Sequence, residues 1–291
     1  MTCPFLKEAE VAYCQSATVR TLIPLAQATA AQDKCASPEH VTCPVYRARA
    51  EAGPDRGACP QLRQALMQYC AAAPVTKFIP YSESLMSRCG NDSFRYCPEY
   101  LKMAHPDATG ATDDELPAPD GLLYASNHMW LDLTGDGTCH AGIDSFLGRV
   151  LGKVDAVTYV HLKTQQRPTV VLTVRGIDLE LVFPNPFRVT ACNLHLLAQP
   201  ARVTAEPYTG GWLFEGTPGL ETDAHLRKGA EAQAWMQEEA RRMNQYLQEY
   251  AGVAADGGLF ERDLARHLPR ASMLALFHEF FSPFASEENG L

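Results

Sequence analysis

Hydrophobic and polar residues alternate with a period of two in the middle of the chain. Residues 129–133 alternate in this way, and residues 154–162 and 169–174 are rich in β-branched side chains. Both patterns are typical of short β-strands. Gly135-Asp-Gly137 has the composition of a tight turn. We therefore predict a domain of short strands in this part of the chain.

A longer period of three to four residues begins after residue 219 and predicts an amphipathic helix of about seven turns. Thr222 or Asp223 is suited to cap the beginning of this helix. Glu238 and Arg242 are four residues apart, which is the spacing of an ion pair on one helix face. The recurring positions are Leu226, Ala230, Gln233, Met236, Ala240, Met243, Leu247 and Tyr250.

Residues 251–258 interrupt the helical pattern, and a second helical region follows them. This region ends in Phe277, Phe280 and Phe281, and Pro283 is placed to stop it. We expect these aromatic side chains to pack against the preceding helix. The alternative is an exposed aromatic patch that docks onto a partner.

The first hundred residues contain a duplicated cysteine pattern. Successive cysteines are 11, 21 and 8 positions apart in the first copy and 11, 19 and 8 positions apart in the second. Proline follows the first and fourth cysteine of each copy, and Ile23-Pro24 matches Ile79-Pro80. Agreement over this length indicates an internal repeat. The cysteines are Cys3, Cys14, Cys35 and Cys43 in the first copy and Cys59, Cys70, Cys89 and Cys97 in the second.

Four cysteines per copy predict a metal site. Each copy has too few large apolar residues for a core of its own, and domains of this size usually depend on a metal, disulfides or a partner. Four thiolates match tetrahedral zinc or a [4Fe-4S] cluster. The absence of a Cys-x-x-Cys pair and the presence of Cys-Pro favour two [4Fe-4S] clusters. The alternatives are two zinc ions, disulfides, or thiols that bind nothing.

The spacing inside each copy predicts helices at residues 6–14 and 62–70, with Leu62, Leu66 and Tyr69 on one face. The later cysteines would then lie at helix ends and in loops. The spacing leaves open whether each metal takes its ligands from one copy or from both.

Charge and hydropathy exclude some classes of partner. The formal charge is −9 and the isoelectric point is about 5.5, so we expect no nucleic-acid binding and no attachment to anionic membranes. No apolar run reaches the roughly 18 to 20 residues of a membrane span, and the first residues lack a secretory signal pattern. We expect a cytoplasmic protein with reduced thiols and without membrane insertion.

The strand-rich domain also carries an ordered series of short motifs. They are Tyr124-Ala-Ser-Asn-His-Met-Trp130, Gly135-Asp-Gly137, Gly142-Ile143, Leu151-Gly152, Pro207-Tyr208 and Gly211-Trp-Leu-Phe214. In this order the motifs resemble the H protein of the glycine cleavage system, a small all-β lipoyl carrier. The resemblance implies a flattened barrel or a sandwich of two small sheets, with a short helix at residues 144–150.

The resemblance also locates the position that carries lipoate in the family. The matching segment is Leu172-Thr-Val-Arg-Gly176, so the lysine of the family falls on Arg175 or Gly176. A guanidinium stays protonated and cannot form the amide, and glycine has no side chain. Lys153 and Lys163 lie outside the motif. We expect no lipoate on this chain.

The remaining candidate residues are expected to pack in the core. His128, Trp130 and Trp212 occur within the motifs, where aromatic side chains contribute much of the buried area of a small β domain. Cys139 and Cys192 lie outside the repeat and are interpreted as small apolar residues.

These observations predict a multidomain α+β protein that is not an enzyme, since no catalytic or nucleotide-binding motif occurs. We expect an accessory electron-transfer or scaffold subunit of a larger redox or metabolic complex. The alternatives are a zinc-stabilised interaction adaptor and a regulator of lipoate-dependent glycine cleavage. The expected parts are the first copy at 1–50, the second copy at 57–104, a linker at 105–120, the β domain at 121–218 and a helical tail at 219–291.

Overall fold

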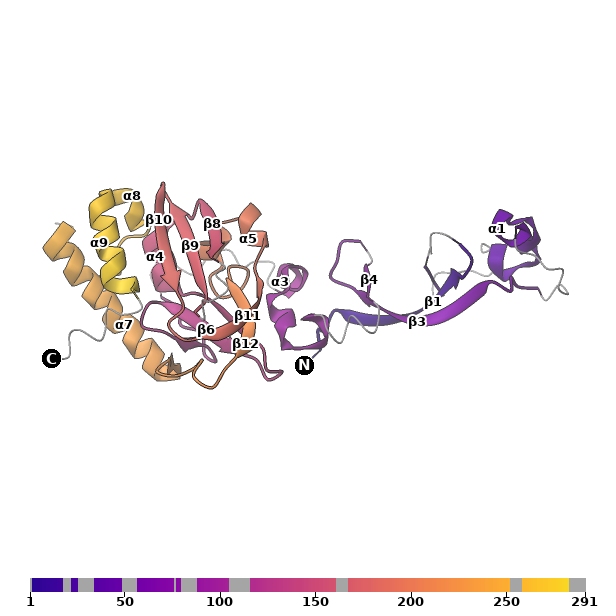
Figure 1. Cartoon of the computed structure of the whole chain (residues 1–291), viewed down its shortest axis with the longest axis horizontal. Coiled ribbons are helices and arrows are strands. Elements are labelled where there is room, and N and C mark those ends of the chain that lie inside the picture. The colour runs from indigo at the N-terminus through magenta and orange to yellow at the C-terminus, as the bar shows by residue number, and fades with distance from the viewer. Residues whose placement is uncertain are drawn as a thin grey trace. The chain divides into compact units, whose positions relative to one another are not determined.

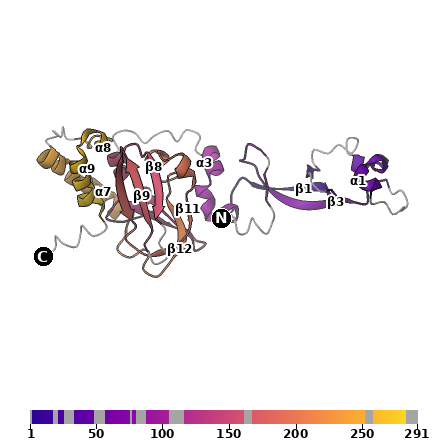
Figure 2. The same cartoon turned by 45° about the horizontal axis from the view of Figure 1, so that its top comes forward.

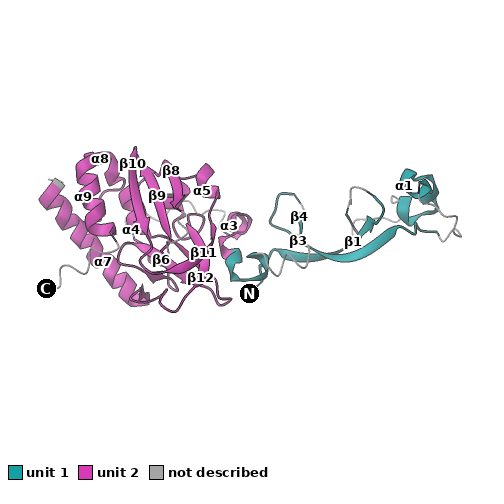
Figure 3. Ribbon diagram, in the orientation of Figure 1, with its two compact units in different colours: residues 1–94 teal, residues 95–291 magenta. Residues whose placement is uncertain are grey.

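The computed structural model describes residues 2–17, 22–25, 34–48, 57–75, 77–79, 88–104, 116–160, 167–251 and 258–282. The chain divides into two compact units, residues 1–94 and residues 95–291 (Figure 3). The first unit contains seven of the eight repeat cysteines, and Cys97 belongs to the second unit.

The first unit is built around a long antiparallel pair of strands, β1 (Leu6–Cys14) and β3 (Leu62–Cys70), shown in Figures 1 and 2. The two strands pair over their whole length, from Leu6 opposite Cys70 to Cys14 opposite Leu62. Two short strands, β2 (Ile23–Pro24) and β4 (Lys77–Ile79), extend the sheet to the order β2-β1-β3-β4.

The prediction of helices at 6–14 and 62–70 was wrong. Leu66 has the spacing of a buried helix position, yet its side chain is 48% exposed. A helix of about nine residues is marginal in isolation, whereas pairing the two copies satisfies the backbone groups on the shared edge of both strands. The equivalent strands of the two copies therefore complete one another.

Short helices follow the strands in the same order in both copies, and the duplication is thus visible in the fold. Cys43 is the N-cap of the helix that Pro44 begins, and a helix likewise begins at Pro98. Proline is favoured at the first helical position, which accounts for the Cys-Pro pair at the end of each copy. The elements are η1 (Lys34–Ala36), η2 (Pro38–Thr42), α1 (Pro44–Arg47), η3 (Arg88–Gly90), η4 (Asp92–Tyr96) and α3 (Pro98–Ala104).

The second unit contains two antiparallel sheets that enclose one core, with the orders β11-β12-β7-β6-β5-β13 and β10-β9-β8. The strand predictions near residues 129, 156 and 169 and the turn at Gly135-Asp-Gly137 are confirmed. The strands are β5 (Leu123–Tyr124), β6 (Met129–Leu133), β7 (Cys139–Ile143), β8 (Ala156–Val160), β9 (Thr169–Val174), β10 (Ile177–Val182), β11 (Phe187–Cys192), β12 (Phe214–Pro218) and β13 (Arg227–Lys228).

Among the residues described in this unit, three short helices connect the strands, namely α4 (Ser145–Leu151), α5 (His195–Ala198) and α6 (Arg202–Ala205). Helix α4 confirms the helix predicted at 144–150, and the Asp144 carboxylate caps it by accepting a hydrogen bond from the Leu147 N–H. His128, Trp130, Trp212 and Cys139 are buried, as predicted, whereas Cys192 is only half-buried.

The carboxy-terminal helices lie side by side against the sheets in the same unit (Figures 1 and 2). They are α7 (Gly229–Tyr246), which continues as the π-helical turn η5 (Leu247–Ala251), then α8 (Leu264–His267) and α9 (Arg270–Phe281). Phe277, Phe280 and Phe281 are buried, and the Phe280 ring lies 5.5 Å from that of Tyr246 in α7. The packing prediction is confirmed for these aromatic residues.

Two details of the predicted helix were wrong. Helix α7 begins at Gly229, so neither Thr222 nor Asp223 caps it; the Thr222 hydroxyl accepts from the Gly219 N–H and donates to Pro186 O instead. The predicted ion pair of Glu238 with Arg242 also differs, because Glu238 pairs with Arg241 and Arg242 pairs with Glu239. Pro283 and most of the predicted break at 251–258 lie outside the described residues. Within the described ranges, no helix is long and apolar enough to cross a membrane.

Candidate functional site

The paired strands β1 and β3 form a two-stranded ribbon. One end of this ribbon brings together cysteines from both copies. Cys14 ends β1 opposite Leu62, and Cys59 precedes β3 in a turn closed by a hydrogen bond from Leu62 N to Cys59 O of 3.0 Å. The Cys59 N–H donates to the carbonyl oxygen of Cys35 at 2.7 Å. The first cysteine of the second copy therefore lies beside the third cysteine of the first copy.

The other end of the ribbon repeats this arrangement with the copies exchanged. Cys70 ends β3 opposite Leu6, whose N–H donates to Cys3 O at 3.1 Å. The Cys3 N–H donates to the carbonyl oxygen of Cys89 at 2.9 Å. The first cysteine of the first copy thus lies beside the third cysteine of the second.

The donor chemistry at these ends suits a thiolate-bound metal, but the side chains are not gathered into a ligand set. All ten cysteines lie in described residues and are thiols. Cys3 and Cys59 are buried, and the other six repeat cysteines are half-buried. Among the residues that the structure describes, no three histidine, cysteine, aspartate or glutamate side chains are close enough to hold one metal ion. Metal binding would require these side chains to turn toward one another.

His40 is a possible nitrogen donor near Cys43 that the cysteine pattern did not identify. Its ring is buried and lies edge-on to Tyr46, and its Nδ1 is 2.8 Å from Ser37 O. The second copy has Phe94, also buried, at the equivalent place three residues before its last cysteine. An aromatic residue shared by both copies indicates packing rather than metal binding.

The last cysteine of the second copy adjoins a tyrosine that is buried in the β domain. Tyr96 Oη donates to Asp132 Oδ2 at 2.5 Å, and its ring stacks on that of His140 at 4.0 Å. Burial, followed by the Asp132 charge, raises the pKa of Tyr96 above its ordinary value. Cys97 is therefore attached to the β domain through its neighbour in the sequence.

Arg175 and Gly176 form the tip of the β9–β10 hairpin. Their φ angles are +52° and +72°, which are those of a two-residue type I′ turn. The Arg175 N–H donates to Asp155 Oδ2 at 2.7 Å, and Arg270 Nη1 donates to Gly176 O at 3.3 Å. Both tip residues are exposed. The tip therefore exposes the guanidinium of Arg175 and a glycine that has no side chain.

His128 is the centre of a buried charged cluster in the second unit. Its Nδ1 is 2.7 Å from Asp144 Oδ2 and its Nε2 is 3.7 Å from Glu239 Oε2. The ring is stacked between Phe146 and Trp235, at 4.0 and 4.6 Å between centroids. Burial alone lowers the pKa of His128, but the two carboxylates outweigh burial and raise this pKa above its ordinary value. The burial predicted for His128 is confirmed. Its ion pair with Glu239 on α7 was not predicted, because no local sequence pattern indicates it.

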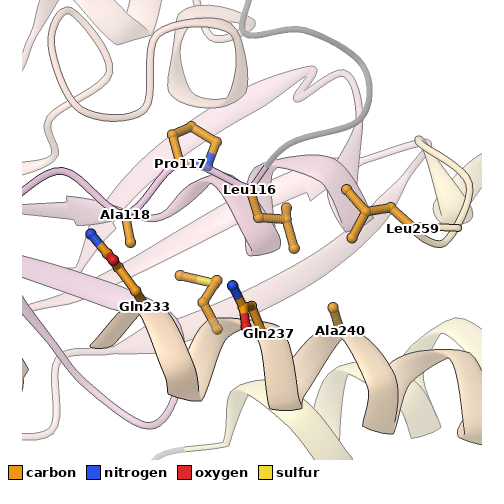
Figure 4. A pocket seen from close by; sticks show the side chains of 8 residues that line it. Leu116, Pro117, Ala118, Gln233, Gln237, Ala240 and Leu259 are labelled. Carbon is orange, nitrogen blue, oxygen red and sulfur yellow. The ribbon is translucent and has the colours of Figure 1, made fainter. Parts of the chain in front are cut away.

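A groove of about 590 Å³ lies between residues 116–118 and helix α7 (Figure 4). Its lining is apolar apart from two glutamine amides. A lining of this kind provides no acid, base or nucleophile for chemistry. The lining residues are Leu116, Pro117, Ala118, Gln233, Met236, Gln237, Ala240 and Leu259.

The two sheets around one core, the capped helix α4 and the exposed two-residue hairpin define a small β-sandwich domain with helices attached. No protein-family model matches the chain. The chain is 33% identical over 121 residues to the glycine cleavage system H protein of Micrococcus luteus, covering 40% of this chain and 93% of that protein. It is 30% identical over 125 residues to the H protein of Salinibacter ruber, covering 41% of this chain and 98% of that protein.

The solved structure of a glycine cleavage system H protein from Mycobacterium marinum is 20% identical to this chain, with a TM-score of 0.35. That match covers 41% of this chain and 99% of the other. The curated relatives show that the chain belongs to the family of glycine cleavage system H proteins. The similarity extends over about 40% of its length.

Proposed function

We propose that this chain is a non-catalytic subunit that docks onto a larger metabolic or redox complex through an H-protein domain that carries no lipoate. The observation that carries this proposal is the hairpin tip at Arg175 and Gly176. The amide that attaches lipoate requires a primary amine, and neither residue supplies one. Such a domain would keep the docking surface of H proteins but would lack the lipoyl-lysine group.

The cysteine repeat suggests what this subunit adds to the complex. We propose that it binds two [4Fe-4S] clusters and transfers electrons. Support comes from the number of cysteines and from the backbone hydrogen bonds that hold Cys59 beside Cys35 and Cys3 beside Cys89 at the two ends of the ribbon. Thiolate ligands require reduced cysteines, which places the proposed function in a reducing compartment such as the cytoplasm.

The second candidate is an adaptor in which two zinc ions only stabilise the repeat. One observation favours it: Pro44 and Pro98 begin helices, so the Cys-Pro pairs have a structural reason that is independent of a cluster. Zinc would contribute folding energy without redox chemistry.

The lipoylation proposal is tested by intact mass spectrometry. The chain is coexpressed with a lipoate-attaching enzyme and lipoate, beside an authentic H protein as the positive control. We expect the native chain to remain unmodified, and we expect partial modification of Arg175→Lys if the attaching enzyme still recognises the hairpin. Modification of the native chain that is lost in Lys153→Arg would overturn the proposal.

The cofactor proposal is tested by metal and acid-labile sulfide analysis of protein purified without oxygen. About eight iron and eight sulfide per chain would support two cubane clusters. Two zinc and no sulfide would replace the electron-transfer function with the adaptor. Copurification with glycine cleavage enzymes would instead indicate a regulator of that system.

A further inference from the structure

We infer that the two metal sites exchange a ligand between the copies, so that each site takes its first cysteine from the other repeat. This inference rests on the metal binding proposed above. One site would use Cys59 together with Cys14 and Cys35. The other would use Cys3 together with Cys70 and Cys89.

Two pairs of equivalent backbone hydrogen bonds support the exchange. Cys59 N donates to Cys35 O at 2.7 Å, and Cys3 N donates to Cys89 O at 2.9 Å. At the same two ends, Gln15 N donates to Gln61 O at 2.9 Å and Ala71 N donates to Phe5 O at 2.8 Å. The same relation therefore occurs twice with the copies reversed, as expected when two repeats complete one another.

The length of the ribbon excludes a site that takes all four cysteines from one copy. Cys3 lies beyond the Leu6 end of β1 and Cys14 lies at its other end. Eight steps of about 3.3 Å separate these ends, which amounts to roughly 26 Å. The sulfur ligands of one tetrahedral zinc ion are only about 4 Å apart, and those of a cubane are within several ångströms. Cys3 and Cys14 therefore cannot serve the same metal while β1 is intact, and the same holds for Cys59 and Cys70 in β3.

The exchange also makes the two sites independent of one another. They lie at opposite ends of a paired ribbon rather than around a shared centre. Loss of one site should therefore leave the other loaded, provided that β1 and β3 remain paired.

Two double variants of the full-length chain distinguish the groupings, because each removes two cysteines but from different combinations. In Cys14→Ala/Cys59→Ala, the exchanged arrangement predicts loss of one site and retention of half the metal. In Cys3→Ala/Cys14→Ala, the exchanged arrangement predicts loss of both sites. If each ligand set came from one copy, Cys14→Ala/Cys59→Ala would lose both sites and Cys3→Ala/Cys14→Ala would lose only one. Far-ultraviolet circular dichroism of both variants checks that the strands persist.

A second measurement decides the question without metal. The reduced, metal-free chain is oxidised slowly with oxidised glutathione, and the disulfides are mapped by mass spectrometry. We expect Cys35–Cys59 and Cys3–Cys89 as the first products, because backbone hydrogen bonds hold these pairs of residues together. Early Cys3–Cys14 or Cys59–Cys70 disulfides would overturn the exchange. Wild-type protein that binds no metal but gives the expected disulfides would refute the proposed cofactors and retain the exchanged pairing of the copies.

Discussion

The buried contact between His128 and Glu239 should attach helix α7 to the β domain, and its contribution can be measured with Glu239→Gln. The substitution keeps the size of the side chain and removes its charge. Glu239 lies on α7 and is 8% exposed, while His128 is fully buried in the β domain. At 3.7 Å the contact is an ion pair rather than a hydrogen bond.

The magnitude follows from the geometry. Two unit charges 3.7 Å apart attract by roughly 4 kcal/mol at an effective dielectric constant of about 20. Asp144 still pairs with His128 in the variant, and the desolvation cost of Glu239 disappears with its charge. The partly exposed pair of Glu239 with Arg242 adds at most about 0.5 kcal/mol. We therefore expect a net loss of about 2 kcal/mol in the free energy of unfolding.

The loss should depend on pH in a defined direction. The pKa of His128 is raised in the folded chain, so its stabilising contribution is full below the unfolded value of about 6.5 and disappears as pH rises through the raised pKa. Burial opposes the charged form of Glu239, but His128 and Arg242 lower its pKa, and this contribution disappears as pH falls through that lowered value. The difference between wild type and variant should therefore be largest near pH 6 and shrink on either side.

Urea unfolding followed by tryptophan fluorescence measures this difference, because all three tryptophans, Trp130, Trp212 and Trp235, lie in the second unit. The matched control is Glu238→Gln on the same helix, where an exposed pair with Arg241 predicts a loss of about 0.5 kcal/mol or less. If Glu239→Gln were no more destabilising than Glu238→Gln at pH 6, the reasoning about the buried charge would be refuted.

Three further substitutions test individual contacts by the same unfolding assay. Gly142→Ala should lose about 1–3 kcal/mol, because its Cβ would lie 2.7 Å from the buried Trp130 ring; an unchanged midpoint would contradict this packing. Tyr96→Phe should lose about 1–3 kcal/mol by removing the hydrogen bond to the buried Asp132 carboxylate; a neutral result would mean that water replaces the hydroxyl. Gly176→Ala should lose about 1–2 kcal/mol through its left-handed φ angle alone, since its Cβ would contact nothing within 4 Å.

Local patterns predicted the strands of the second unit because alternation along one segment reports which face is buried. They failed for β1 and β3 because Leu62, Leu66 and Tyr69 have the spacing of a helix face, while each strand is stabilised by its partner in the other copy. A pattern read within one segment contains no information about that pairing.

The candidate sites divide in the same way. The hairpin tip was located from a motif, since the turn, its glycine and its flanking strands are adjacent in sequence. Glu239, the partner of His128 on α7, could not be predicted from a motif, because the two residues are brought together only by packing of the helix on the sheets. Nor did the cysteine spacing show which thiols share an end of the ribbon.

The repeat itself could have indicated the exchange, because neither copy is a complete folding unit. A single copy supplies one nine-residue strand with a short strand on one edge, and the backbone donors and acceptors of its other edge are unpaired until the second copy is added. Pairing equivalent strands antiparallel places the beginning of each copy beside the end of the other copy's strand. The first cysteine of each copy precedes the long strand of that copy. It therefore lies beside later cysteines of the other copy. This arrangement follows from the antiparallel register of β1 and β3 and does not depend on a metal.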